Sequence, residues 1–182
     1  MTSDPELVDA SEPPPDYEGA ARKLILDQLT GQARSRKELA DRLAKKGIPD
    51  DVYEPLLDRF EEVGLVDDAA FARIWVASRQ SGKGLARRAL AQELRRKGID
   101  DETAREAVAE VHAEDEEAAA VTLVRRKLRS MTELAPEVKM RRLVGMLARK
   151  GYPPGVALRV VRAAVDAAEG LGDSAGMPES LP

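Results

Sequence analysis

Hydrophobic and polar positions follow the same pattern three times along this chain. The copies are RLAKKGIPDD (42–51), ELRRKGIDDE (93–102) and MLARKGYPPG (146–155). In each copy, leucines lie four and eight residues before the glycine, and apolar residues lie nine and ten residues after it. A spacing of four and eight places the leucines on one stripe of a helix. The pattern therefore predicts a helix that ends at each of the glycines, Gly47, Gly98 and Gly151.

A lysine precedes each of these glycines, and the Lys-Gly pair is typical of a helix end. Glycine adopts the left-handed conformation that terminates many helices. The lysines, Lys46, Lys97 and Lys150, lie where unpaired carbonyls make the helix end negative. We interpret the pair mainly as a helix cap, with a direct functional role as the alternative.

Each of these helices has a predicted neighbour on both sides. Apolar segments at 20–29, 69–78 and 118–128 open the copies, and a third helix follows each glycine. Ser35 and Glu38 have the spacing of a capping box, while Asp50 and Asp100 are suitable N-caps. Pro55 predicts that its helix starts late or bends.

The sequence thus predicts an all-α protein of three tandem three-helix repeats, helix-turn-helix-like, covering 19–66, 67–113 and 114–168. No segment alternates as a strand would. A period near fifty residues favours an elongated, curved array. The ends, 1–18 and 169–182, are rich in acidic residues, Pro, Gly and Ser, so we expect both to be disordered acidic tails.

Charge is distributed unevenly along the chain. The net charge is −4, yet residues 1–20 and 166–182 contain acidic residues and no Lys or Arg. Residues 117–165 contain eleven Lys and Arg against three acids. A basic third repeat indicates an anionic partner, although a solvated helical surface has the same composition.

Composition argues against most enzyme classes. The chain has no cysteine and one histidine, His112, so it offers neither a thiolate nor a histidine metal cluster. Motifs of P-loop, dinucleotide-binding, serine hydrolase and HExxH enzymes are missing. The paired aspartates at predicted helix starts suit capping better than catalysis. We expect no enzyme activity, no cofactor and no metal.

Targeting signals are also missing from the printed sequence. The first twenty residues lack a basic and an apolar region, and no run approaches 18 apolar residues. We expect a soluble, cytoplasmic protein with no membrane association.

Arginine- and lysine-rich faces lie opposite the apolar stripes of several predicted helices. Such faces suit phosphates or a carboxylate-lined protein groove. Trp75 and Phe71, four residues apart, are expected to pack in the core, with base stacking as the alternative. The candidate partner-binding residues are Arg79, Lys83, Arg87, Arg88, Arg95, Arg96, Lys97, Arg125, Arg126, Lys127, Arg129, Lys139, Arg142, Arg149 and Lys150.

The segment GLVDDAAFARIWVASRQSGKGLARRALAQELRRKGIDDE (64–102) resembles the signature segment of the RecX family of bacterial recombination regulators. The resemblance covers roughly residues 20–165, and it is weaker in the third copy, where Tyr152, Pro153 and Pro154 replace Ile-Asp-Asp. The matching positions in this segment are Gly64, Leu65, Asp68, Phe71, Ala72, Trp75, Val76, Arg79, Gly82 or Gly84, Glu93, Leu94, Lys97, Gly98 and Ile99.

This resemblance implies a monomer that binds in the groove of the RecA nucleoprotein filament. It implies restraint of the RecA recombinase, ATPase and coprotease activities in DNA repair and the SOS response. Single-stranded DNA is a further implied partner, and contact with double-stranded DNA is left open. The alternative is a tandem helix-turn-helix DNA-binding protein, although the acidic starts of two of the third helices disfavour phosphate there.

Overall fold

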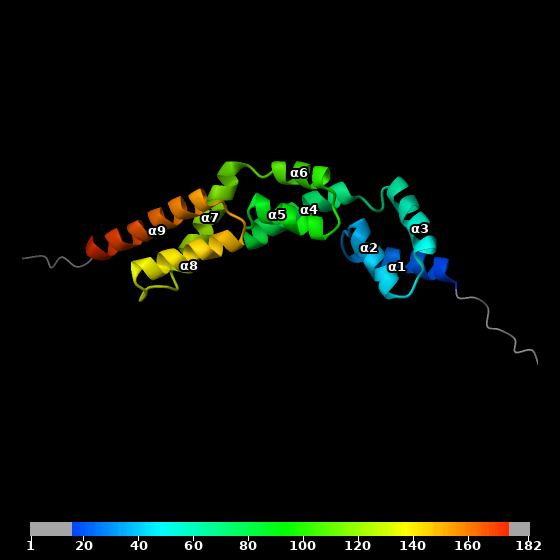
Figure 1. The fold of residues 1–182 in the computed structure, drawn as a ribbon, viewed down its shortest axis with the longest axis horizontal. Coiled ribbons are helices and arrows are strands. Elements are labelled where there is room, and N and C mark those ends of the chain that lie inside the picture. The colour runs from blue at the N-terminus through cyan, green and yellow to red at the C-terminus, as the bar shows by residue number, and fades with distance from the viewer. Residues whose placement is uncertain (1–15, 175–182) are drawn as a thin grey trace, which may run out of the picture. The chain divides into compact units, whose positions relative to one another are not determined.

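A computed structural model describes residues 16–174, and this part of the chain is entirely helical. Nine helices follow one another without a strand in these residues (Figure 1). They are α1 (Tyr17–Gly31), α2 (Arg36–Lys45), α3 (Asp50–Glu62), α4 (Asp68–Lys83), α5 (Arg87–Arg96), α6 (Asp101–Ala109), α7 (Ala113–Leu128), α8 (Pro136–Arg149) and α9 (Pro154–Ser174). The all-α prediction and the three helices per repeat are confirmed.

Each repeat has its own hydrophobic core. The first core includes Ile25, Leu39, Leu43, Leu57 and Phe60. The second includes Phe71, Val76, Leu90, Leu94 and Ile99. The leucine stripes predicted from the spacing are fully buried in all three copies. Among residues 16–174, two compact units are formed, one by 16–34 with 39–66 and one by 35–38 with 67–174.

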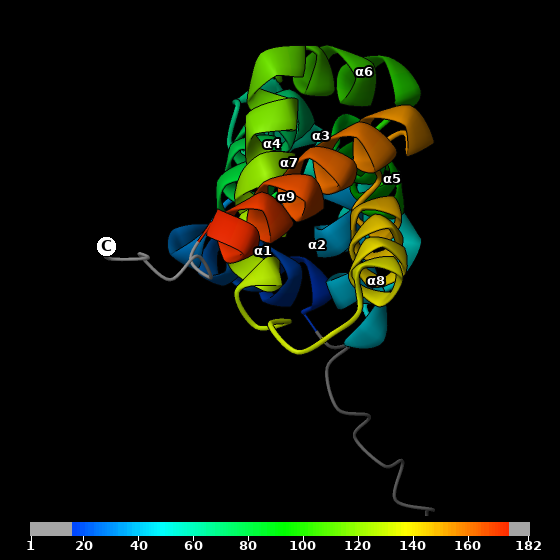
Figure 2. The same cartoon turned by 90° about the vertical axis from the view of Figure 1, so that its left-hand side faces the viewer.

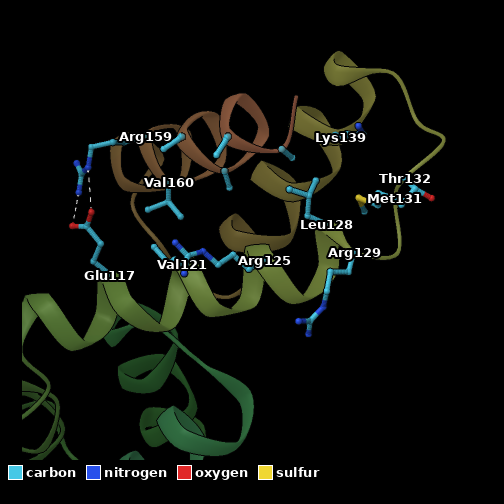
Figure 3. Close-up of a pocket in the computed structure, with 14 residues that line it drawn as sticks. Glu117, Val121, Arg125, Leu128, Arg129, Met131, Thr132, Lys139, Arg159 and Val160 are labelled. Atoms are coloured by element: carbon cyan, nitrogen blue, oxygen red, sulfur yellow. Dashed lines mark hydrogen bonds and ion pairs between the residues drawn. The ribbon is translucent and has the colours of Figure 1, made fainter. Parts of the chain in front are cut away.

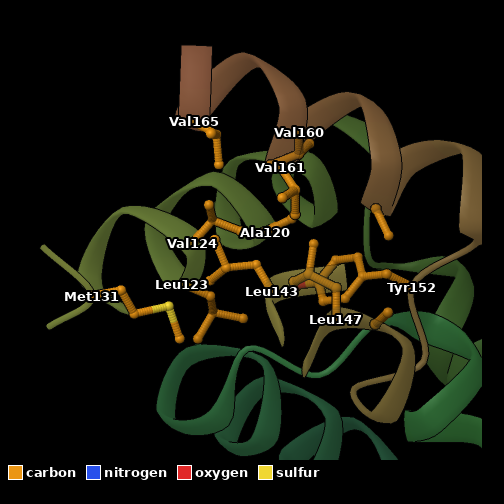
Figure 4. Close-up of a cluster of buried hydrophobic side chains, with 12 residues drawn as sticks. Ala120, Leu123, Val124, Met131, Leu143, Leu147, Tyr152, Val160, Val161 and Val165 are labelled. Carbon is orange, nitrogen blue, oxygen red and sulfur yellow. The ribbon is translucent and has the colours of Figure 1, made fainter. Parts of the chain in front are cut away.

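The third core lies among α7, α8 and α9, and these three helices lie side by side (Figure 2). Leu143 and Leu147 of α8 meet Val124 of α7 and Val161 of α9. Tyr152, which follows α8, is buried with them, and its ring lies beside Leu143 and Leu147 (Figure 4). The replacement of Ile by Tyr in the third copy therefore retains a buried apolar body.

The Lys-Gly corners are three equivalent helix ends. Gly47, Gly98 and Gly151 have φ of 75°, 84° and 90°, in the left-handed region. The amide after each glycine donates to the carbonyl five residues earlier, for example Ile99 N to Leu94 O at 3.1 Å. This is the bond of a Schellman cap, and the residue that donates it is buried in every copy. The predicted caps are confirmed.

The predicted N-terminal caps are confirmed in part. The amide of Glu38 donates to Ser35 Oγ and the amide of Ser35 donates to Glu38 Oε2, as a capping box requires. Asp100 accepts from the amides of Glu102 and Thr103. Hydrogen bonding from Thr103, first from its side chain and then from its amide, holds the pKa of the Asp100 carboxyl below its ordinary value. The N-cap of α3 is instead Pro49, with no side-chain bond.

Of the two outcomes that Pro55 predicted for α3, a late start or a bend, the late start is wrong. The helix begins at Asp50 and includes Pro55 in its second turn. Pro55 and Asp51 are both exposed, so water can satisfy the carbonyl that loses its amide partner.

Helix boundaries differ from the sequence prediction at several places. Helix α4 runs through the Gly-containing link to Lys83, and α5 begins only at Arg87. Helix α1 begins at Tyr17 and α9 continues to Ser174, so both extend into segments predicted to be tails. Apolar residues up to Val165 anchor the long α9. The rest of the predicted tails, 1–15 and 175–182, lies outside the described residues.

None of the helices in residues 16–174 has the length and apolar character needed to cross a bilayer. Over the same residues, no group of three or more His, Cys, Asp or Glu side chains could hold a metal ion.

Candidate partner-binding surface

Two of the candidate cations lie against Trp75 in the second repeat. The Arg79 guanidinium lies 4.0 Å from the centre of the Trp75 ring, and the Lys97 ammonium lies 4.2 Å from it. Arg79 Nε also lies 3.3 Å from Glu93 Oε2, which accepts from the indole N–H. Phe71 stacks on Trp75 at 5.6 Å between ring centroids. Trp75 is therefore surrounded by side chains of its own repeat, as the core-packing interpretation predicts.

The Lys150-Gly151 corner joins the third repeat to the second. The amide of Ala86 donates to the carbonyl of Lys150 at 2.9 Å, and Lys150 Nζ donates to the carbonyl of Lys83. The Tyr152 hydroxyl donates to the carbonyl of Gly84 at 3.1 Å. A Cβ at Gly151 would lie 2.7 Å from the backbone nitrogen of Ala89, so glycine permits this close approach.

Buried Glu116 completes that junction. Its carboxylate accepts from the amide of Arg87 at 2.9 Å and from Arg87 Nε at 3.1 Å. Because α5 has no side-chain N-cap of its own, this carboxylate of α7 satisfies an otherwise unpaired amide at the start of α5. Glu116 is only 9% exposed and has its charge partner in Arg87, as a buried carboxylate requires.

A matching set of contacts involves the first turn of α2, residues 35–38, which belongs to the same compact unit. Ser35 Oγ donates to the carbonyl of Lys97 at 2.7 Å, and the amide of Arg36 donates to Asp68 Oδ1 at 2.8 Å. Lys97 Nζ pairs with Glu38. The carbonyl of Lys97 thus accepts a hydrogen bond from the start of α2, and the carbonyl of Lys150 accepts one from the start of α5. At both corners the donor lies at the start of the middle helix of the preceding repeat, which gives the Lys-Gly corner a second structural role.

Exposed cations remain on α4, α5, α7 and α8. Arg87 pairs with Glu116, and Arg95 pairs with Asp101 across the α5–α6 turn, whereas the other exposed candidates have no ion pair within residues 16–174. These exposed, unpaired candidates are Lys83, Arg88, Arg96, Arg125, Arg126, Lys127, Arg129, Arg142 and Arg149. Lys139 is half-buried.

Four cations surround one hollow of about 420 Å³ between the end of α7 and α8. Lys127 lines it from α7, and Arg141, Arg142 and Arg149 line it from α8. Ser130, Met131, Gly145 and Met146 are the other described residues that line it, and no carboxylate is among the lining residues from 16–174. We call this the basic hollow. Its chemistry suits an anion with several oxygens, such as a phosphate.

Further positive charge gathers where α4, α7 and α8 approach one another. Burial first, and then the nearby charges of Arg126 and Lys83, lower the pKa of Lys150 from its ordinary value. An anion beside these three cations would relieve their mutual repulsion.

Sequence reasoning did not identify two residues of this surface. Glu116 lies in a run of acids that resembles an exposed first turn, and its burial arises from the contact with Arg87 of another repeat. Arg141, which lines the basic hollow, is not among the candidates. A helical projection of 136–150 could have identified it, since Arg141 and Arg142 are neighbours and both are exposed.

The fold and this surface define a class, a helical binding protein made of three three-helix repeats with a basic third repeat. Family models agree. Residues 21–60 match the first three-helix domain of RecX, residues 67–108 the second and residues 114–161 the third. The chain belongs to the RecX family.

Individual relatives give the same answer, and a solved structure has the same fold. The chain is 53% identical over 155 residues to the "Regulatory protein RecX" of Streptomyces lividans, covering 85% of this chain and 82% of the relative. It is 51% identical over 157 residues to that of Thermobifida fusca, covering 86% and 85%. The crystal structure of RecX from Lactobacillus salivarius aligns with a TM-score of 0.71 at 21% identity, covering 82% of this chain and 97% of that one. That likeness supports the fold alone.

Proposed function

We propose that this protein binds the RecA nucleoprotein filament in its helical groove and restrains the recombinase, ATPase and coprotease activities of RecA. It acts in DNA repair and the SOS response, in the cytoplasm, as a monomer, and by binding rather than by catalysis. The family supports a regulatory role. The single observation that supports the filament as partner is the basic hollow, whose lining within residues 16–174 offers four cations and no carboxylate to a phosphate-rich ligand.

The basic hollow is proposed as the contact to the DNA of the filament. Guanidinium groups bind phosphate oxygens in a bidentate manner, and three of the four cations are arginines. A hollow with unpaired cations attracts the partner without first breaking internal ion pairs. Arg79, Arg87, Lys97 and Lys150 are proposed instead to hold this surface in place, because each is engaged within the protein.

The test reverses charge in the hollow. Arg142→Glu with Arg149→Glu should raise the concentration needed to inhibit RecA-driven, single-strand-dependent ATP hydrolysis by at least tenfold. Both side chains are exposed, so the thermal transition should be retained. The matched control is Arg73→Glu with Arg105→Glu, which makes the same charge change at exposed positions of α4 and α6.

Two results would contradict the proposal. Equal inhibition by the hollow variant and the control would remove the hollow from the interface. Failure of the unaltered protein to inhibit RecA, together with sequence-specific duplex binding, would favour the helix-turn-helix alternative.

A further inference from the structure

A second concave surface lies on the third repeat, between α7 and α9. It is a groove of about 760 Å³, a volume typical of ligand-binding sites (Figure 3). Its floor is apolar and includes Val121 and Leu128 of α7, Met131 of the α7–α8 connection and Val160 of α9. We call this the α7–α9 groove.

Small side chains on α9 leave this groove open. Ala163, Ala164, Ala167 and Ala168 line it, one pair per turn, so beyond Val160 the lining residues of α9 are all alanines with no long side chain to fill the space. Ala167 and Ala168 are exposed, whereas Val161 and Val165 of the same helix are buried in the core. One face of α9 therefore forms the core and a neighbouring face lies open to a ligand.

The charges around the groove are mainly positive. Arg125, Arg129 and Lys139 line it and have no ion pair within residues 16–174. Among the described residues that line it, the one carboxylate is that of Glu117, which Arg159 binds at 2.6 Å (Figure 3). Three uncompensated cations around an apolar floor are complementary to a ligand that has an apolar side and several carboxylates.

The length of the groove indicates the size of that ligand. The lining of α7 with its C-cap runs from residue 117 to 129, and that of α9 from residue 159 to 168. At a rise of 1.5 Å per residue these stretches are roughly 18 Å and 14 Å long. An occupant that lies along both helices would have about three helical turns in contact.

We propose that the α7–α9 groove binds an acidic amphipathic helix of about three turns, contributed by a protein partner. Its apolar residues, spaced i, i+3, i+4 and i+7, fill the space above the α9 alanines. Its carboxylates meet Arg125, Arg129 and Lys139. The groove thus gives the third repeat a peptide-binding site distinct from the basic hollow. The inference stands apart from the proposed function, because its test contains neither RecA nor DNA.

The test uses fluorescence anisotropy and a labelled synthetic helix of about four turns, with Leu at i, i+3, i+4 and i+7 and Glu at most other positions. The full-length chain should bind this peptide at least tenfold more tightly than a version with Lys for Glu or one with Ser for Leu. Ala167→Glu, which places a carboxylate in the groove, should weaken binding at least tenfold. Arg129→Glu at the rim should do the same.

Ala118→Glu is the matched control, because it makes the same substitution at an exposed position of α7 outside the groove lining. Its affinity for the acidic peptide should stay within twofold of that of the unaltered protein. Equal affinity of the acidic and basic peptides, or no binding of the acidic one, would overturn the proposal. An Ala118→Glu variant that loses as much affinity for the acidic peptide as Ala167→Glu would also overturn it.

Other occupants give different results. A dimer of the full-length chain that dissociates on Ala167→Glu would mean that a second copy fills the groove. Tenfold tighter peptide binding by a chain starting at Asp16 would mean that residues 1–15 fill it. Either result would overturn the proposed external partner.

Discussion

Identical residues at the three Lys-Gly corners have different surroundings. All three glycines are left-handed, but a Cβ at Gly47 would meet nothing within 4 Å. A Cβ at Gly151 would lie 2.7 Å from both the Cβ and the backbone nitrogen of Ala89. At Gly47 the glycine is needed for its conformation alone, and at Gly151 it is needed for its conformation and for its lack of volume.

This difference gives a prediction about stability. Gly47→Ala should lower the free energy of unfolding by about 1 kcal/mol, the cost of a left-handed alanine. Gly151→Ala should cost roughly 1–3 kcal/mol more, because the backbone of Ala89 must move. Urea unfolding of both variants measures the difference. Equal costs would mean that the repeats adjust at this corner without strain.

At the scale of the element, the start of α5 and the ends of α4 and α8 are held by groups from other repeats. Tyr152 shows this well, because its buried hydroxyl bonds the carbonyl of Gly84, just beyond α4. Burial, with a smaller contribution from the charge of Glu116, raises the pKa of Tyr152 to about 12 from its ordinary 10.0. The folded protein therefore keeps the phenolic proton between pH 10 and pH 12, where the unfolded chain releases it.

The difference in free energy of unfolding between the unaltered protein and Tyr152→Phe should depend on pH. Below pH 10 the variant should be less stable by about 1 kcal/mol, because the Gly84 carbonyl loses its partner. As pH rises from 10 towards 12, the unaltered protein should lose the stability linked to Tyr152, and the gap to the variant should narrow.

Urea midpoints of both proteins at pH 8 and pH 11 provide the measurement. Tyr53→Phe, at a half-buried tyrosine of the first repeat, is the matched control. A gap that is the same at both pH values would show that the Tyr152 proton is not linked to folding.

At the scale of the whole molecule, the sequence predicted what depends on local spacing. The Gly-centred pattern identified three repeats and their buried leucines, because helix periodicity and capping are properties of short segments. The Glu116–Arg87 bond and the α7–α9 groove depend on which helices pack together. Repeat spacing could not reveal them, since Glu116 and Arg87 are 29 residues apart. The resemblance of residues 64–102 predicted the family, and the distribution of charged residues alone predicted the basic third repeat.

The most direct test of the central claim is co-sedimentation with RecA filaments on single-stranded DNA, compared with the same DNA without RecA. The protein should pellet with the filaments at concentrations where bare DNA retains little of it. If phosphates are contacted, log affinity should fall by roughly 0.7 per phosphate contact for each tenfold rise in salt. Equal pelleting with bare DNA, or none with filaments, would contradict a regulator that binds the RecA filament.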